Sequence, residues 1–369
     1  MNGKISYISI NQNKLIFIEC LRFFSAFSVL VWHYVHFSFQ SYAPLDYDKN
    51  NLPFNEILRP LYDLGGAGVL FFWCISGYIF FYKYQNSIIE NRTSPKAYFI
   101  NRFSRLYPLH FLTLIAVFCM QIFYFNQNNT YFVYEFNDLY HLFLQFFFIS
   151  HWGFENGYSY NGPIWSVSVE IIVYIIFFIT LKFFGKSSFY NILIILACVL
   201  SKLFTDTTYI LFDCVIFFYC GGQTLIITNF FQKKKIFLNL NFKFFFFFLI
   251  LIPFTCWFFE LNKIKYFYFL FFLIYGCCLL MISSMKFNLD SKVLNLIKAL
   301  GNMTYGSYLL HFPLQILIVI IFNFLEIKLP IYENWFFLFY IFLVLFLAHI
   351  SYNKFELPMQ KFIRKYNNN

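Results

Sequence analysis

The sequence predicts an all-α, polytopic membrane protein, and three observations support this fold class. Hydrophobic residues make up 60% of the 369-residue chain and charged residues only 12%, whereas soluble proteins average about 25% charged residues. The apolar residues gather in stretches of about 20, the length that a helix needs to cross the hydrocarbon core of a bilayer. The Lys and Arg residues concentrate in every second connection between these stretches. A soluble globular domain is therefore excluded.

Ten stretches are apolar enough to be predicted as membrane-spanning helices. They lie at about 15–38, 63–84, 105–125, 163–184, 189–204, 208–229, 243–259, 265–285, 303–325 and 334–355. A shorter apolar piece at 139–151 is predicted to be an interfacial or re-entrant segment. The first stretch lacks a small-residue cleavage site, so it is interpreted as a retained helix and not as a signal peptide. We expect one membrane domain over 1–369, without an appended soluble domain.

The basic residues predict the orientation of the chain. With the N-terminus inside, 20 of the 27 Lys and Arg residues fall in cytoplasmic segments, six lie outside and Arg22 lies within a helix. This bias predicts two cytoplasmic termini in a multi-pass protein of the cell (inner) membrane. It also accounts for the net charge of +10, so a nucleic-acid partner is not expected. The nine cysteines form no C-x-x-C pair, so we expect no metal site and no disulfide.

Arg22 and His33 lie inside the first predicted span, and every residue between them is apolar or small. Eleven residues are close to three helical turns, so the two side chains share one face, roughly 16 Å apart along the axis. Ionisable groups at such depth are costly and usually mark a function. The pair predicts a reaction that reaches across the bilayer.

Glu170 lies about 10 Å below the outer surface on the fourth predicted span, at a depth similar to that of His33. Ser166 and Tyr174 share its helix face at i, i+4 spacing. Glu170 is either a structural carboxylate or a group that orients His33 or accepts a proton from it, and we favour the second interpretation.

Arg102 and Arg105 stand at i, i+3 where the third predicted span begins on the cytoplasmic side. Two guanidinium groups that point the same way match the oxygens of a phosphorylated ligand. The alternative is a positive-inside anchor that contacts lipid head groups.

These segments resemble, in order along nearly the whole chain, the membrane-bound acyltransferase 3 family, which O-acylates carbohydrates and other extracytoplasmic acceptors. Six blocks carry the resemblance: 19–22 followed by His33, 69–78, 102–108, 163–170, 305–313 and 356–358. The sequence departs from the family pattern at Phe23 and Phe24, where small residues are usual, and at Ile171, where a polar residue is common. These departures concern helix packing and acceptor preference more than the reaction.

The resemblance implies an O-acyltransferase that uses acyl-CoA as co-substrate, with no bound cofactor. The acyl group is most simply acetyl, and the acceptor is a hydroxyl of an extracytoplasmic glycan such as a lipopolysaccharide, O-antigen, capsule or exopolysaccharide precursor. His33 would act as general base or, less favoured, as the acylated nucleophile. Glu170 and Arg22 complete the predicted catalytic set.

Arg102 and Arg105 would hold the donor's phosphates at the cytoplasmic mouth, and His311, about 12 Å above the cytoplasmic end of the ninth span, would line the donor tunnel or serve a structural role. Ser166, Ser168 and Trp165 are predicted to contact substrate, and the two hydroxyls or helix dipoles would stabilise the oxyanion. The other histidines, His36 included, are interpreted as interfacial or packing residues.

Two other classes of protein are alternatives to an acyltransferase. A proton-coupled transporter would use Arg22, His33 and Glu170 as its relay, but the sequence shows no internal repeat and no paired broken helices. A non-catalytic export or scaffold component would not require buried ionisable residues aligned at these depths.

Overall fold

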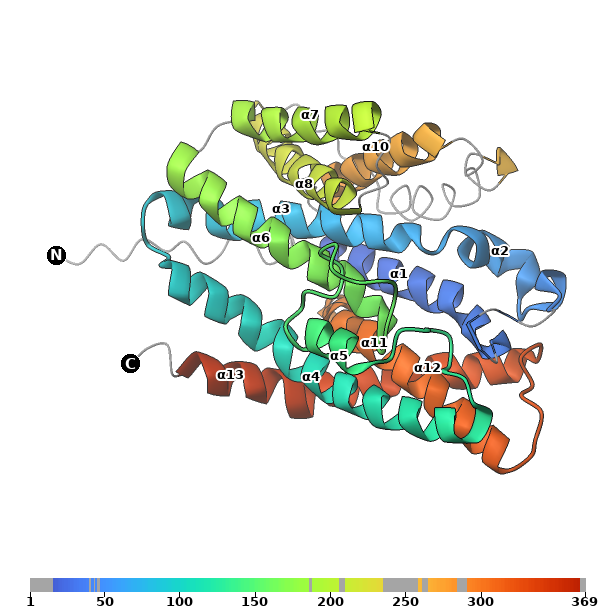
Figure 1. The fold of residues 1–369 in the computed structure, drawn as a ribbon. Coiled ribbons are helices and arrows are strands. Elements are labelled where there is room, and N and C mark those ends of the chain that lie inside the picture. The colour runs from blue at the N-terminus through green and yellow to red at the C-terminus, as the bar shows by residue number, and fades with distance from the viewer. Residues whose placement is uncertain are drawn as a thin grey trace.

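The computed structural model describes residues 16–39, 41–42, 44, 47–185, 188–205, 210–234, 258–260, 265–283 and 291–365. The chain forms a bundle of long helices (Figure 1). The helices are α1 Ile16–His33, α2 Asn55–Leu64, α3 Ala67–Ile89, α4 Pro95–Asn128, α5 Leu139–Phe146, α6 Trp165–Phe184, α7 Ser188–Thr205, α8 Ile210–Lys233, α10 Lys265–Ser283, α11 Ser291–Phe324, α12 Asn334–Ser351 and α13 Leu357–Lys365.

Seven helical segments of the described chain are long and apolar enough to cross a membrane. They are Phe17–Ser38, Ala67–Ile89, Pro95–Asn128, Gly162–Phe184, Ile210–Lys233, Ser291–Phe324 and Asn334–Lys365. Two shorter apolar helices, Ser188–Phe204 and Phe269–Met281, coincide with two further predicted spans. Most of the predicted span at 243–259, residues 243–257, lies outside the described residues. The all-helical membrane class is therefore confirmed, whereas the number of ten spans stays a prediction.

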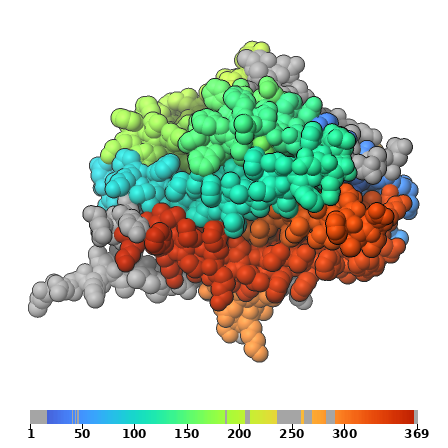
Figure 2. All heavy atoms as spheres, turned by 60° about the horizontal axis from the view of Figure 1, so that its bottom comes forward, coloured from blue at the N-terminus to red at the C-terminus, as the bar shows by residue number. Residues whose placement is uncertain are grey.

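The helices are arranged in three groups (Figure 1). Helices α7, α8 and α10 lie on one side, α4, α12 and α13 lie on the opposite side, and α1, α3, α6 and α11 occupy the middle. Figure 2 shows α4 as a continuous band beside α12 and α13. Large exposed apolar side chains project from α4, α6, α7 and α12, among them Phe123, Phe183, Phe204, Phe342 and Phe346. Such a surface is suited to lipid contact.

Two helices begin earlier than the hydropathy pattern predicts. Helix α4 begins at Pro95, ten residues before the predicted start, because Ser94 caps it by accepting a hydrogen bond from the backbone N–H of Ala97 and proline is suited to the first helical position. Helix α11 begins at Ser291 and runs for 34 residues. Both N-terminal extensions contain too many polar residues to be recognised by their hydropathy. They nevertheless form part of the same continuous helices.

Helices α3 and α8 are held in close contact by two glycines. A Cβ atom added to Gly77 would lie 1.8 Å from the carbonyl oxygen of Phe218, and one added to Gly221 would lie 1.9 Å from that of Cys74. Both contacts are with backbone, which cannot move aside as a flexible side chain can. Small residues at these positions allow the two backbones to approach closely.

We expect Gly77→Ala to destabilise the protein by about 1–3 kcal/mol, the usual cost of overpacking, because the added methyl group must push α3 and α8 apart. The measurement is the apparent melting temperature of the purified protein in detergent. Gly66→Ala is the matched control, since its added Cβ would meet Trp32 at an ordinary 3.4 Å. Equal melting temperatures for the two variants would contradict the prediction.

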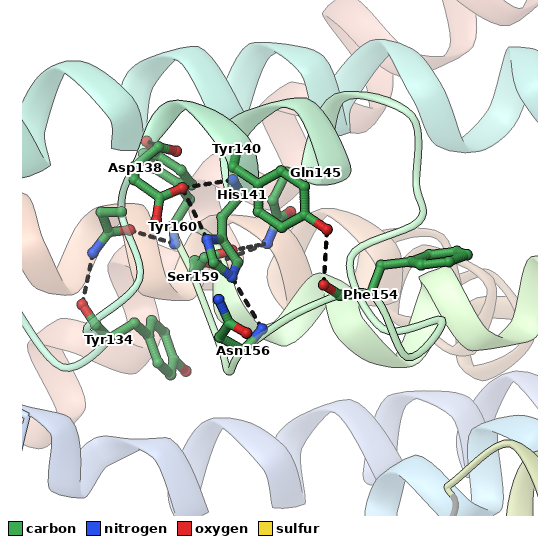
Figure 3. A network of polar contacts seen from close by, with 10 residues as sticks. Tyr134, Asp138, Tyr140, His141, Gln145, Phe154, Asn156, Ser159 and Tyr160 are labelled. Carbon is green, nitrogen blue, oxygen red and sulfur yellow. Dashed lines mark hydrogen bonds and ion pairs between the residues drawn. The ribbon is translucent and has the colours of Figure 1, made fainter.

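The connection between α4 and α6 is folded against the bundle and contains the short helix α5 (Figure 3). Asp138 begins α5: its Oδ1 accepts a hydrogen bond from the backbone N–H of His141 at 2.8 Å and lies 2.9 Å from Nδ1 of the same residue. The backbone N–H of Asn156 donates to His141 Nε2 at 3.2 Å. The predicted segment 139–151 is therefore a short helix followed by a pinned loop, and Leu139 and Phe143 expose apolar side chains.

Candidate active site

A cavity among α1, α3, α4, α6 and α11 brings the three predicted arginines together. Arg22, Arg102 and Arg105 line it, with Glu170 and Ser166 also in its wall. The space between its walls that no atom fills is about 830 Å³, including the part open to solvent. We call it the arginine cavity. Five of the nine predicted site residues, taken from three separate spans, thus meet in one place.

The arginines differ in how well the protein pairs them. Arg22 forms a 2.7 Å ion pair with Glu19 and donates to the hydroxyl of Thr304 at 2.9 Å. Arg102 donates to the hydroxyl of Tyr84 at 2.6 Å, while its Nε is buried without a hydrogen-bond partner.

Arg105 has no ion pair and no side-chain hydrogen bond within the part of the chain that the structure describes. Its guanidinium also faces the positive charges of Arg22 and Arg102. Because cations that are partly removed from water need partners, the cavity is suited to an anionic ligand.

Glu170 is the one carboxylate among the described residues that line the arginine cavity. It faces the hydroxyls of Ser76 and Tyr174 and lies within electrostatic reach of Arg102 and Arg105. Within the described chain Glu170 makes no hydrogen bond to His33, although the predicted depths of these two residues in the membrane are similar. Similar depth does not determine the direction of a side chain around its helix axis, which depends on packing.

His33 is paired with His311 and not with a carboxylate. His33 Nδ1 lies 2.8 Å from His311 Nε2, and His311 Nδ1 lies 2.7 Å from the carbonyl oxygen of Tyr308. Because a carbonyl can only accept, His311 Nδ1 carries the proton, and for neutral rings Nε2 of His311 is then an acceptor. His33 Nδ1 must donate to it. The chain of hydrogen bonds leaves Nε2 of His33 with a free lone pair.

The expectation that His311 lines the donor tunnel is not met for the arginine cavity, because His311 is not among its lining residues. The predicted depth of His311 assumes that its helix begins at residue 303, whereas α11 begins at Ser291. His311 is therefore 20 residues into the helix, beside His33 at the C-terminal end of α1, and it is fully buried.

Two residues near His33 were missed as site residues. The ring of His36 stacks on His33 with centroids 4.6 Å apart. Gln315 donates from Nε2 to the carbonyl oxygen of His33 at 2.7 Å and faces His36 Nδ1 with Oε1 at 3.2 Å. A glutamine one turn after His311 in an apolar helix was a usable signal. Among the described residues, no three His, Cys, Asp or Glu side chains could hold a metal ion.

Tyr308 connects the arginine cavity with the histidine pair. Its hydroxyl, in the cavity wall, lies 2.7 Å from Ser166 Oγ and donates to the carbonyl oxygen of Pro163 at 2.9 Å. Its backbone carbonyl accepts the hydrogen bond from His311. The cavity therefore reaches a residue that lies one helical turn of α11 from His311.

Among the described contacts, the other two predicted substrate residues make no hydrogen bond or ring contact with His33 or His311. Ser168 donates from Oγ to the carbonyl oxygen of Phe148 and accepts from the backbone N–H of His151, so its hydroxyl fastens the α5–α6 loop. Trp165 packs edge-on against Trp73, with ring centroids 5.8 Å apart. Trp73 in turn lines the arginine cavity.

These features define a multi-pass helical membrane protein with a cationic cavity and a buried histidine pair. The chain belongs to the acyltransferase 3 family, because the family's acyltransferase domain model matches residues 15–352. A protein of Acidianus two-tailed virus, named "Putative acetyltransferase ORF330", is 26% identical over 172 residues, which are 47% of this chain and 42% of that protein. The chain thus spans less than half the length of this curated relative. No solved structure matches the chain.

Proposed function

We propose that the protein transfers an acyl group, most simply acetyl, from acyl-CoA at the cytoplasmic face to a hydroxyl of an extracytoplasmic glycan. One observation carries this proposal: a cavity with unpaired arginine charge reaches a residue one helical turn from His311, whose partner His33 has a free Nε2. Family membership supports acyl transfer as the class of reaction. The acyl donor, the acceptor and the role of His33 belong to the proposal.

The donor would enter with its phosphates at Arg102 and Arg105. Arg105 is the better anchor because its guanidinium is free to form a bidentate contact with phosphate oxygens. Glu170 would hold the arginines in place from the opposite wall. A thin pantetheine arm would then run along the cavity toward Ser166 and Tyr308, which form its far end.

His33 would act as the general base. As the acceptor oxygen attacks the thioester carbonyl, its proton passes to Nε2 of His33. The carbon–sulfur bond then breaks, and the leaving thiolate takes that proton back to give free CoA. The hydroxyls of Ser166 and Tyr308 line the cavity and donate to the carbonyl oxygen of Pro163, so they would turn from that oxygen to stabilise the oxyanion of the tetrahedral intermediate.

The experiment that tests this function uses the purified protein in liposomes, with acetyl-CoA on the side where α4 begins and methyl pyranosides on the other side as hydroxyl acceptors. We expect release of free CoA, detected with a thiol reagent. The rival transporter would move protons without cleaving the thioester, which a pH-sensitive dye inside the liposomes would detect. Proton flux without CoA release would overturn the proposal.

His311 is assigned a positioning role, because it holds the proton of His33 on Nδ1. We expect His311→Ala to lower kcat by at least about tenfold while the KM for acetyl-CoA stays within about twofold, since His311 does not line the arginine cavity. His311→Gln should recover part of the rate, because its amide oxygen can accept from His33 Nδ1. A rise in donor KM without loss of kcat would instead place His311 in donor binding.

A further inference from the structure

A row of aromatic rings runs from the histidine cluster to the arginine cavity along the outer loops. His36 and Tyr134 have ring centroids 5.9 Å apart, Tyr134 and Tyr158 6.1 Å, Tyr158 and Trp165 6.2 Å, and Trp165 and Trp73 5.8 Å. We call these residues the aromatic row. It joins the two parts of the candidate active site on the side opposite to the start of α4.

Tyr158 is the member of the row that presents a ring to solvent. It is 42% exposed, while it stacks on the imidazole of His151, with centroids 5.6 Å apart and planes within 2°. His151 Nδ1 lies 3.1 Å from Glu155 Oε1, and the other oxygen of Glu155 accepts from the backbone N–H of Gly153 at 2.9 Å. A partly exposed aromatic ring thus lies beside a carboxylate that is fixed in place.

The row is held rigidly before any ligand binds. A Cβ atom on Gly162 would lie 2.2 Å from the ring of Tyr134, so only glycine admits this ring at its position. Asn137 accepts from the backbone N–H of Tyr160 at 2.6 Å, and Gln145 donates to the carbonyl oxygen of Ser159 at 2.8 Å (Figure 3). The two residues after Tyr158 are therefore tied to the α5 region.

Backbone strain is also concentrated in this loop. Val133 and Tyr160 have φ values of 63° and 44°, in a left-handed region that non-glycine residues rarely occupy and that costs of order 1–3 kcal/mol each. Strain of this kind persists where the surrounding structure enforces it, and it clusters at ligand sites. The fold therefore maintains the conformation of this loop at an energetic cost.

We propose that Tyr158 and Glu155 form the acceptor subsite, which binds a pyranose ring of the glycan. The inference rests on the proposed function and deepens it. The C–H face of a sugar ring packs on an aromatic ring, which is why a rigid amphipathic side chain such as tyrosine is suited to this contact. The carboxylate of Glu155 accepts hydrogen bonds from hydroxyls at the edge of the sugar. The aromatic row then leads from the bound ring toward His36 and His33.

His151 supports the ring of Tyr158 in the subsite. Burial lowers the pKa of His151 below its usual value, although the nearby Glu155 carboxylate acts in the opposite direction. The imidazole is then neutral near pH 7, so it provides a flat surface under Tyr158 and not a competing cation for Glu155.

The test uses saturation-transfer NMR on the purified protein with methyl α-D-glucopyranoside, methyl α-D-galactopyranoside and methyl α-D-mannopyranoside as probes. Sorbitol, which has hydroxyls but no ring, is the matched ligand control. We expect ring protons of at least one pyranoside to be saturated, and sorbitol to give no comparable signal. Tyr158→Ala should weaken binding by about two- to tenfold, and Tyr158→Phe should retain it. Glu155→Gln, which keeps the shape of the side chain, should also weaken it.

Tyr42→Ala is the matched protein control, because Tyr42 is equally exposed, at 43%, on another outer loop. Parent-like binding by both Tyr158→Ala and Glu155→Gln, equal saturation of sorbitol, or no binding of any of the pyranosides would overturn the inference. CoA release from acetyl-CoA is measured on the same samples. If CoA is released but the two variants bind sugar as the parent does, the subsite is wrong and the proposed reaction stands. If sugar binds through Tyr158 but no CoA is released, the proposed reaction is wrong.

Discussion

Replacing His33 with alanine is expected to lower the rate of acyl transfer by about 100- to 10,000-fold, the usual contribution of a positioned general base. The substitution removes Nε2, the ring atom that the hydrogen bonds to His311 and Tyr308 leave free. The KM for the donor should change little, because His33 does not line the arginine cavity. Release of CoA and transfer of labelled acetyl to an acceptor are the two measurements.

His349→Ala is the control for this variant, because His349 is exposed on α12 and contacts only Asn353 among its described hydrogen-bond partners. It should transfer at the parent rate. A normal rate for His33→Ala, with a melting temperature close to that of the parent, would remove His33 from the mechanism. The base would then have to be sought among His36 and the hydroxyls at the end of the cavity.

Replacing Arg105 with glutamine is expected to raise the KM for acyl-CoA by about 10- to 150-fold, the equivalent of one lost charge-assisted contact of about 1.5–3 kcal/mol. The value of kcat should fall less, since Arg105 lines the arginine cavity whereas His33 and His311 do not. Binding of CoA to the purified variant by calorimetric titration checks the same quantity without turnover.

The stability of this variant separates donor binding from a structural role. Arg105 faces the cations Arg22 and Arg102 and the carboxylates of Glu19 and Glu170, without an ion pair of its own in the described chain. Loss of its charge therefore removes repulsion and attraction together, and we expect the melting temperature to change little. Arg92→Gln is the matched control, because Arg92 has a side chain that is 65% exposed and lies outside the cavity. If Arg105→Gln binds CoA as tightly as Arg92→Gln, Arg105 is not part of the donor site.

The hydropathy of the chain was enough to locate most of the helices. The predicted spans at 63–84, 163–184 and 334–355 lie on α3, α6 and α12, because each is apolar along its length. The starts of α4 and α11 were missed by about ten residues, since polar extensions continue a helix without contributing to its hydropathy. His311 consequently lies farther from the start of its helix than the predicted span implies.

Most residues of the candidate site could be predicted from the sequence, but the contacts between them could not. Ionisable residues in apolar spans are rare enough that Arg22, His33 and Glu170 could be selected from the sequence alone, and Arg102 and Arg105 from their spacing. The partner of His33 could not be selected, because His311 is 278 residues away in the chain. Nor could the sequence separate Ser166, which lines the cavity, from Ser168, which fastens a loop two residues later.

The sequence by itself determined that this is a helical membrane protein and supplied candidate site residues, because ionisable side chains are costly to bury in lipid and are therefore rare in apolar spans. Only the tertiary structure decided that the three arginines share one cavity with Glu170 and that His33 is paired with His311. The physical reason is that side-chain direction depends on how each helix is rotated and shifted against its neighbours. Close contacts such as that of Gly77 with Phe218 set this rotation, and their partners lie far apart in the chain.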